Sequence, residues 1–118
     1  MVAAFQSLDM ARFRDVTLDD AGLMREILTA LIEDTSRQLP LLGDAIGGRD
    51  PLRIRRLAHY SKGACANVGA QAAAEALDQI EKQAARSNFE ECSLSLTLLA
   101  SEVARLRDQT LPSLAGAG

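Results

Sequence analysis

Aromatic residues are scarce in this chain of 118 residues, which contains no tryptophan, one tyrosine and three phenylalanines. Without large rings, the core must be filled by Leu, Ile, Val and Ala, and such a core suits close packing of helices. Hydrophobic residues still make up 47% of the sequence, which is ordinary for a globular protein. The length suggests one domain over residues 1–118, with an ordered core from about residue 8 to residue 112.

Features of several other protein classes are absent. No apolar run approaches the roughly 20 residues of a membrane span, and the N-terminus lacks a basic region followed by an apolar stretch, so we expect neither a membrane segment nor a signal peptide. The net charge of −3 argues against a nucleic-acid partner. Cys65 and Cys92 occupy apolar helix positions, which indicates reduced core residues rather than a disulfide and predicts a cytoplasmic protein.

The first half of the chain predicts two helices and contains no strand pattern. Asp9 is expected to cap a short helix that ends near Arg14, and Thr17 is the predicted N-cap of the next helix. Apolar residues at helical spacing carry that second helix to Gly47-Gly48, where glycine ends it. Pro40 lies inside this run, so we expect a kink or a brief break there.

The second half predicts three more helical segments. Asp50-Pro51 has the cap and first-turn residues of a helix start, and Gly69 is expected to bend or interrupt that helix. Helix continues over 70–86, and Ser87 with Glu90 forms a capping-box pattern for the last helix. That helix is expected to end at 110–112, before a frayed tail over 115–118. Four substantial helices with short connections predict an all-α, antiparallel four-helix bundle with a short N-terminal helix.

The only histidine, His59, lies in the stretch AHYSKGACANVGA. On a helical wheel it lies about 160° from the centre of the apolar cluster, so we expect its imidazole to face solvent. Lys62 and Gly63 follow it by three and four positions, which makes them its neighbours on the helix surface. The other residues of this face are the cations Arg55 and Arg56 one turn earlier, Ala66 a further turn beyond Lys62 and Gly63, and Tyr60 at the edge of the buried stripe.

This face has the features of an anion-accepting nucleophile. Glycine inside a helix costs about 1 kcal/mol relative to alanine, and at position 63 it removes bulk that would crowd the imidazole. A good part of an exposed imidazole is neutral near pH 7 and can act as a nucleophile, and the nearby cations favour an anion such as a phosphoryl group. Each feature also has an ordinary interpretation, as a surface histidine without function, a glycine at a helix contact, and a solvated basic face. Spacing and exposure alone leave both interpretations open.

The segment 58–70 resembles the motif of histidine-containing phosphotransfer (HPt) domains, which is approximately A-H-x-L-K-G-S/A-S/A-x-x-L/V-G-A. The order of segments also matches over nearly the whole chain: an acidic helical segment, a short Gly-Asp connection, the histidine helix and a helix rich in Ala and Glu. The residues that fit the motif are Ala58, His59, Lys62, Gly63, Ala64, Ala66, Asn67, Val68, Gly69 and Ala70.

The resemblance implies a four-helix phosphocarrier that relays phosphoryl groups between receiver-domain aspartates in multistep two-component signalling. His59 would be the phosphoacceptor through its distal ring nitrogen, Lys62 would stabilise phosphate charge, and Gly63 would leave room for the partner. Glu81 or Gln83, on the helix after Gly69, would lie near the imidazole. The implied partners are response-regulator receiver domains and a hybrid histidine kinase.

Other sequence features limit the alternatives. No Gly-rich phosphate loop, nucleotide-binding pattern or metal-ligand cluster is present, so we expect no ATP site, cofactor or metal and no independent enzymatic activity. A helical adaptor that binds receivers or dimerises without being phosphorylated is the second hypothesis, and a true histidine enzyme is the third. Ser61 stands where the motif has leucine, and its hydroxyl is expected to bond back to the carbonyl one turn earlier.

Overall fold

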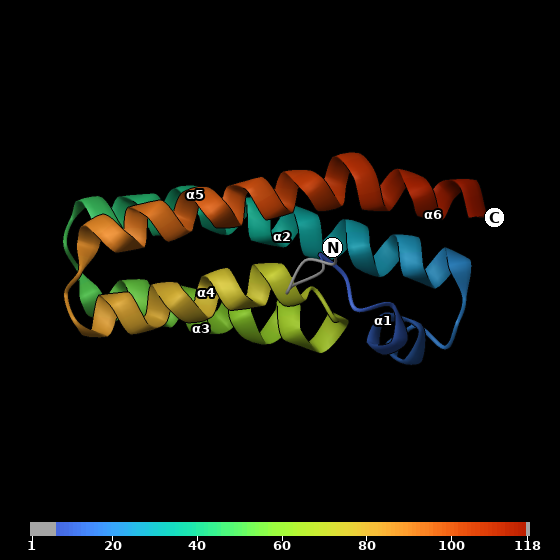
Figure 1. The fold of residues 1–118 in the computed structure, drawn as a ribbon, viewed down its shortest axis with the longest axis horizontal. Helices are drawn as coiled ribbons and strands as arrows, with labels where there is room; N and C mark the ends of the chain where they lie inside the picture. Colours follow the sequence, from blue (N-terminus) through green and yellow to red (C-terminus); the bar gives the residue numbers. More distant parts are fainter. Residues whose placement is uncertain (1–6, 118) are drawn as a thin grey trace, which may run out of the picture.

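The computed structural model describes residues 7–117, with side chains through Leu114, and these residues contain helices and no strand. Four long helices form the body: α2 (Ala21–Gly47), α3 (Pro51–Val68), α4 (Gln71–Ala85) and α5 (Phe89–Arg105). They alternate in direction, and α2 and α4 each lie beside both α3 and α5 (Figure 1). The short helix α1 (Met10–Val16) lies at the end of the α3–α4 pair. The predicted antiparallel four-helix bundle is therefore confirmed.

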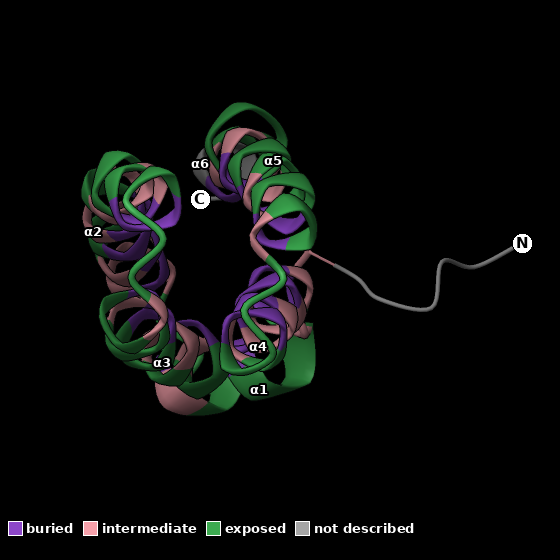
Figure 2. Cartoon of the chain, turned by 90° about the vertical axis from the view of Figure 1, so that its left-hand side faces the viewer, coloured by how far each residue is buried: buried purple, intermediate pink, exposed green. Residues whose placement is uncertain are grey.

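The core lies along the axis of the bundle, because each helix turns its buried side inward and its exposed side outward (Figure 2). Aliphatic side chains fill it, as the scarcity of aromatic residues predicts. The largest fully buried side chains include Phe13, Leu28, Leu42, Ile54, Leu77, Ile80 and Leu99. Cys65 and Cys92 are free and buried, and burial raises the pKa of the Cys65 thiol to about 11. Within residues 7–117, no helix has the length and apolarity to cross a bilayer.

Helix α2 has a different N-cap from the one predicted, and it is continuous through Pro40. Its N-cap is Asp20, whose carboxylate accepts a hydrogen bond from the Leu23 N–H at 2.8 Å, while Thr17 is buried at the end of α1. The Thr17 hydroxyl instead donates to the carbonyl of Phe13 at 2.7 Å. Pro40 does not break the helix. Because Pro40 lies on the exposed side, water can satisfy the carbonyl that its missing N–H leaves free.

Gly69 ends α3, as predicted, in the left-handed conformation with a φ of 96°. A side chain at this position would be strained, and its Cβ would lie 3.0 Å from the carbonyl oxygen of Asp9. The close approach exists because the Asp9 N–H donates to the Gly69 carbonyl at 2.7 Å, while the Arg12 guanidinium donates to the carbonyl of Asn67. The turn between α3 and α4 is thus covered by α1.

Helix α5 also starts and ends differently from its prediction. Its N-cap is Asn88, which accepts from the Glu91 N–H at 3.3 Å, whereas Ser87 has a positive φ of 54°. The predicted end at 110–112 is wrong, because a π-helical segment, η1 (Leu106–Thr110), leads directly into α6 (Leu111–Ala117). The helix therefore runs through most of the predicted frayed tail, and Gly118 lies outside the described residues.

Candidate functional site

His59 lies on the outer face of α3, where that helix runs antiparallel to α4. Its side chain is 75% exposed, as the helical wheel predicts. Asp50 starts the helix by accepting from the Arg53 N–H at 3.1 Å, with Pro51 as the first helical residue. The buried side of α3, which includes Ile54 and Ala58, faces the core and turns position 59 outward.

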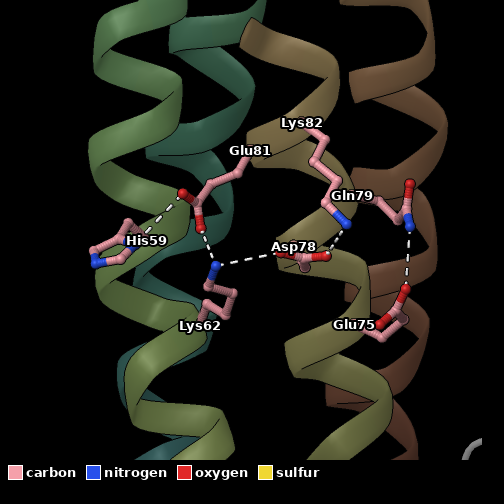
Figure 3. A network of polar contacts seen from close by, with 7 residues as sticks. All are labelled: His59, Lys62, Glu75, Asp78, Gln79, Glu81 and Lys82. Atoms are coloured by element: carbon pink, nitrogen blue, oxygen red, sulfur yellow. Dashed lines mark hydrogen bonds and ion pairs between the residues drawn. The ribbon is translucent and has the colours of Figure 1, made fainter.

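Glu81 is the acidic group beside the imidazole. Its Oε2 atom lies 3.4 Å from Nδ1 of His59, and the other ring nitrogen points away from α4 (Figure 3). A carboxylate next to Nδ1 favours the tautomer that carries its proton on that nitrogen. The lone pair of Nε2 is then left on the side of the ring that faces away from α4.

Lys62 connects Glu81 to a second carboxylate. Its ammonium lies 2.6 Å from Oε1 of Glu81 and 3.3 Å from Oδ1 of Asp78, and Asp78 also pairs with Lys82 at 2.9 Å (Figure 3). The Glu81 contact is the main reason why the pKa of Lys62 is raised, while the bond from Lys82 is the main reason why the pKa of Asp78 is lowered. Both groups therefore stay charged at neutral pH.

One oxygen of Glu81 depends on this lysine. Oε1 is buried, and the Lys62 ammonium at 2.6 Å is the polar group that compensates it. The other oxygen reaches toward His59. Removing the ammonium would leave a buried carboxylate oxygen uncompensated, which is costly. Lys62 thus fixes the carboxylate that lies against the imidazole.

The surface beside His59 in the other direction is open. A Cβ atom built on Gly63 would meet no atom within 4 Å, and Ala66, one turn further, is exposed. Nothing in the described residues therefore covers this flank of the imidazole.

A shallow depression lies on the N-terminal side of the imidazole. Its lining consists of Leu52, Arg55, Arg56, His59, Tyr60 and Glu81. The structure thus brings His59 together with both arginines and with Tyr60, whereas Gly63 and Ala66 lie outside this lining.

Of the two residues expected near the imidazole, Glu81 or Gln83, Glu81 is the one that lies there. Gln83 does not lie at the imidazole, because it is buried against α5, where its amide oxygen lies 2.9 Å from the hydroxyl of Ser95. Ser61 is buried as expected, but its hydroxyl has no hydrogen-bond partner in the described part of the chain. The expected bond from Ser61 to the preceding turn is therefore not formed.

Sequence reasoning missed Asp78 and Leu52, although one signal was available for Asp78. If the α3–α4 pair turns at Gly69-Ala70, residues equally far before and after Ala70 face one another. His59 and Glu81 stand in that relation, as do Lys62 and Asp78. Leu52 could be found only from the structure, since its spacing places it on a face that is otherwise polar.

Among residues 7–117, no group of three potential ligand side chains could hold a metal ion.

Comparison with known proteins provides an independent test of the fold and family. A family model described as "Hpt domain" matches residues 26–109, which include the whole of α3 and α4. The sequence matches no curated protein at a significant level.

Solved structures share the fold. Histidine-containing phosphotransfer protein B (HptB) from Pseudomonas aeruginosa PAO1 has a TM-score of 0.83 and 21% identity, over 96% of this chain and 97% of that one. The histidine-containing phosphotransfer protein ZmHP2 from maize has a TM-score of 0.80 and 22% identity, over 94% and 86% of the two chains. MtHPt2 from Medicago truncatula has a TM-score of 0.77 and 22% identity, over 94% and 80%. Because the family model covers more than half of the sequence, this chain belongs to the Hpt domain family.

Proposed function

We propose that this protein is a histidine phosphocarrier that relays a phosphoryl group between receiver-domain aspartates in a multistep two-component phosphorelay. Hpt proteins are phosphocarriers rather than enzymes with a chemistry of their own. The observation that carries the proposal is the exposed imidazole of His59, which has a carboxylate at Nδ1 and its other ring nitrogen turned away from α4. His59 is accordingly the proposed phosphoacceptor.

The transfer needs little from this chain beyond a nucleophile and access to it. The Nε2 lone pair forms a bond to phosphorus while the bond between phosphorus and the aspartyl oxygen of the receiver breaks, which returns the receiver carboxylate. The reverse step on a second receiver regenerates free His59. Such transfers depend on in-line placement and on neutralisation of charge. Gly63, with open space above it, is the proposed approach route.

Glu81 and Lys62 are the proposed positioning residues. Glu81 orients the ring and keeps the Nδ1 proton in place, and Lys62 holds Glu81 through the 2.6 Å contact. Lys62 also adds positive charge near the phosphoryl group, although two carboxylates already balance that charge. We therefore propose that the main contribution of Lys62 is made through Glu81.

The remaining chemistry belongs to the partners. A receiver would supply the phosphoryl group together with its own bound divalent metal, and a hybrid histidine kinase would charge the relay from ATP. The Hpt family interacts with receivers and kinases of this kind, and we propose the same partner classes here. The location in the cytoplasm stays a prediction.

Replacement of the imidazole tests the proposal. The wild-type protein, incubated with a panel of phosphorylated receivers, should acquire a label that is stable in alkali and labile in acid, and His59→Gln should acquire none. Circular dichroism should show equal helix content, because His59 is exposed and its side chain is not part of the core. Retained label in His59→Gln would reject His59 as the acceptor.

Two further outcomes are informative in the same assay. A wild-type protein that binds receivers but is never labelled would be the adaptor instead of a phosphocarrier. Glu81→Gln should be labelled more slowly, because a neutral amide holds the proton on Nδ1 of His59 less firmly than a carboxylate does. An unchanged rate of labelling would remove Glu81 from the positioning role.

A further inference from the structure

The depression beside His59 combines exposed apolar side chains with unpaired positive charge. Leu52 is 55% exposed and Tyr60 is 59% exposed, and both contribute to its lining. Large apolar side chains gathered on one surface are typical of a site that binds another macromolecule. Arg55 and Arg56 complete the lining and are both exposed.

The charges around His59 are distributed unevenly. On the α4 side, the two cations Lys62 and Lys82 are balanced by the two carboxylates of Asp78 and Glu81, so that group carries no net charge. Arg55 and Arg56 form no ion pair with any acidic side chain of the described residues. The uncompensated charge beside the imidazole is thus the pair of guanidinium groups.

The position of this charge along α3 is defined. Arg55 and Arg56 precede His59 by four and three residues, which is one helical turn, or about 5 Å along the axis. A partner centred on the imidazole would therefore meet the arginines only on the side toward the N-terminus of α3. Guanidinium groups pair with carboxylates through two parallel hydrogen bonds, so they favour acidic side chains in a defined orientation.

We propose that Leu52, Arg55, Arg56 and Tyr60 form a selectivity surface for receivers that carry an apolar side chain flanked by carboxylates next to their phosphorylated aspartate. This inference rests on the proposed function and adds which receivers are chosen and how they are oriented. The apolar side chain of the receiver enters the depression between Leu52 and Tyr60. Its carboxylates pair with the two arginines one turn from the site of transfer, which fixes the rotation of the receiver on α3.

The test is a charge reversal with a matched control on the same helix. Phosphoryl transfer from each receiver of a panel is measured for wild type, for Arg55→Glu/Arg56→Glu and for Arg53→Glu, at low and high salt. Arg53 is also exposed on α3 but does not line the depression. For the receiver that wild type prefers, the double variant should lower the second-order rate constant about tenfold or more and flatten its salt dependence. The Arg53→Glu variant should behave like wild type.

Compensation by the receiver completes the test. Among single replacements of acidic residues by arginine around the receiver active site, at least one should restore transfer to Arg55→Glu/Arg56→Glu and impair transfer to wild type. The proposal would be overturned if Arg55→Glu/Arg56→Glu had the same rate and salt dependence as Arg53→Glu. It would also be overturned if wild type formed a dimer that the double variant dissociates, because the surface would then bind a second copy of this chain. Failure of the proposed function is distinct, since wild type would then accept no label from any receiver or from phosphoramidate.

Discussion

Two serines are buried in the bundle, and their hydroxyl groups have different surroundings. The Ser95 hydroxyl lies 2.9 Å from the side-chain amide oxygen of Gln83, whereas the Ser61 hydroxyl has no partner within the described residues. A buried hydroxyl without a hydrogen bond costs about 1–3 kcal/mol, because it loses its contacts with water. The HPt motif that the sequence resembles has leucine at position 61, so this chain carries a polar group at a buried position where the motif has an apolar one.

Replacement of these two serines by alanine should therefore have opposite effects. Ser61→Ala removes the unpaired hydroxyl and should raise the free energy of unfolding by about 1 kcal/mol. Ser95→Ala should lower it by about 1 kcal/mol, because the amide of Gln83 then loses one of its hydrogen-bond partners. Urea unfolding followed by circular dichroism measures both. A loss of stability in Ser61→Ala would mean that its hydroxyl has a partner, such as a bound water.

At the scale of the element, helical periodicity predicted which faces are buried but not where each helix begins and ends. The expected caps at Thr17 and Ser87 were displaced to Asp20 and Asn88. All four residue types are good caps, so local sequence could not decide between them. Which side chain accepts the hydrogen bond from a backbone N–H of the first turn depends on how the chain enters each helix. That entry is determined by tertiary packing.

The C-terminal helix shows a second reason why the predicted and observed helix ends differ. The buried stripe of α5 advances in steps of three and four as far as Leu106, and the next leucines are five and eight residues later, at positions 111 and 114. The π-helical η1 accommodates the extra residue, so Leu114 is buried and Leu111 packs against the core. Pro112 was expected to end the helix, but α6 continues past it to Ala117. A prediction based on a strict α-helical period could not detect this change.

Within α3, Gly63 gives up helix stability at a position where no described residue lies close enough to require a glycine. A Cβ at this position would meet no atom within 4 Å, so Gly63→Ala should raise the free energy of unfolding by up to about 1 kcal/mol. The added methyl group points into the proposed approach route to His59, so the rate of phosphotransfer should fall, and Gly63→Gln should lower it further. The measurements are urea unfolding and the rate of label transfer from a phosphorylated receiver.

Gly43 in α2 provides the matched control. Its added Cβ would make only an ordinary contact, 3.8 Å from Leu96, so Gly43→Ala should be more stable than wild type at an unchanged transfer rate. If Gly63→Ala transferred phosphate as fast as Gly43→Ala, the glycine at position 63 would have no role in access.

At the scale of the whole molecule, the site exists because two helices face one another across a single turn. His59 and Lys62 come from α3, and Glu81 and Asp78 come from α4, so neither helix alone holds the network. The exposure of His59 could be predicted from one helical wheel. The pairing required the register that Gly69 sets, together with the side-chain rotamers, and these are decided by the assembled bundle.

The same network makes the stability of the bundle depend on pH. The bond from Lys82, followed by that from Lys62, lowers the pKa of Asp78 below its ordinary value of 3.8. The folded state therefore favours the charged carboxylate, and this stabilisation is complete above the ordinary pKa and lost as the pH falls through the lower, folded-state pKa. Asp78→Asn should accordingly be less stable than wild type at pH 6, and the difference between the two proteins should shrink as the pH is lowered to 3.

Urea unfolding at the two pH values measures this difference, and Asp108→Asn is the control. Asp108 pairs with Arg107 at 3.0 Å on the surface of η1, where its side chain is 63% exposed, and exposed pairs of this kind contribute little. Asp108→Asn should therefore lose as much stability between pH 6 and pH 3 as wild type does. Equal losses in Asp78→Asn and wild type would show that the Asp78 carboxylate does not stabilise the folded bundle. Of the two carboxylates of α4 that contact Lys62, only Glu81 would then hold the ammonium in place.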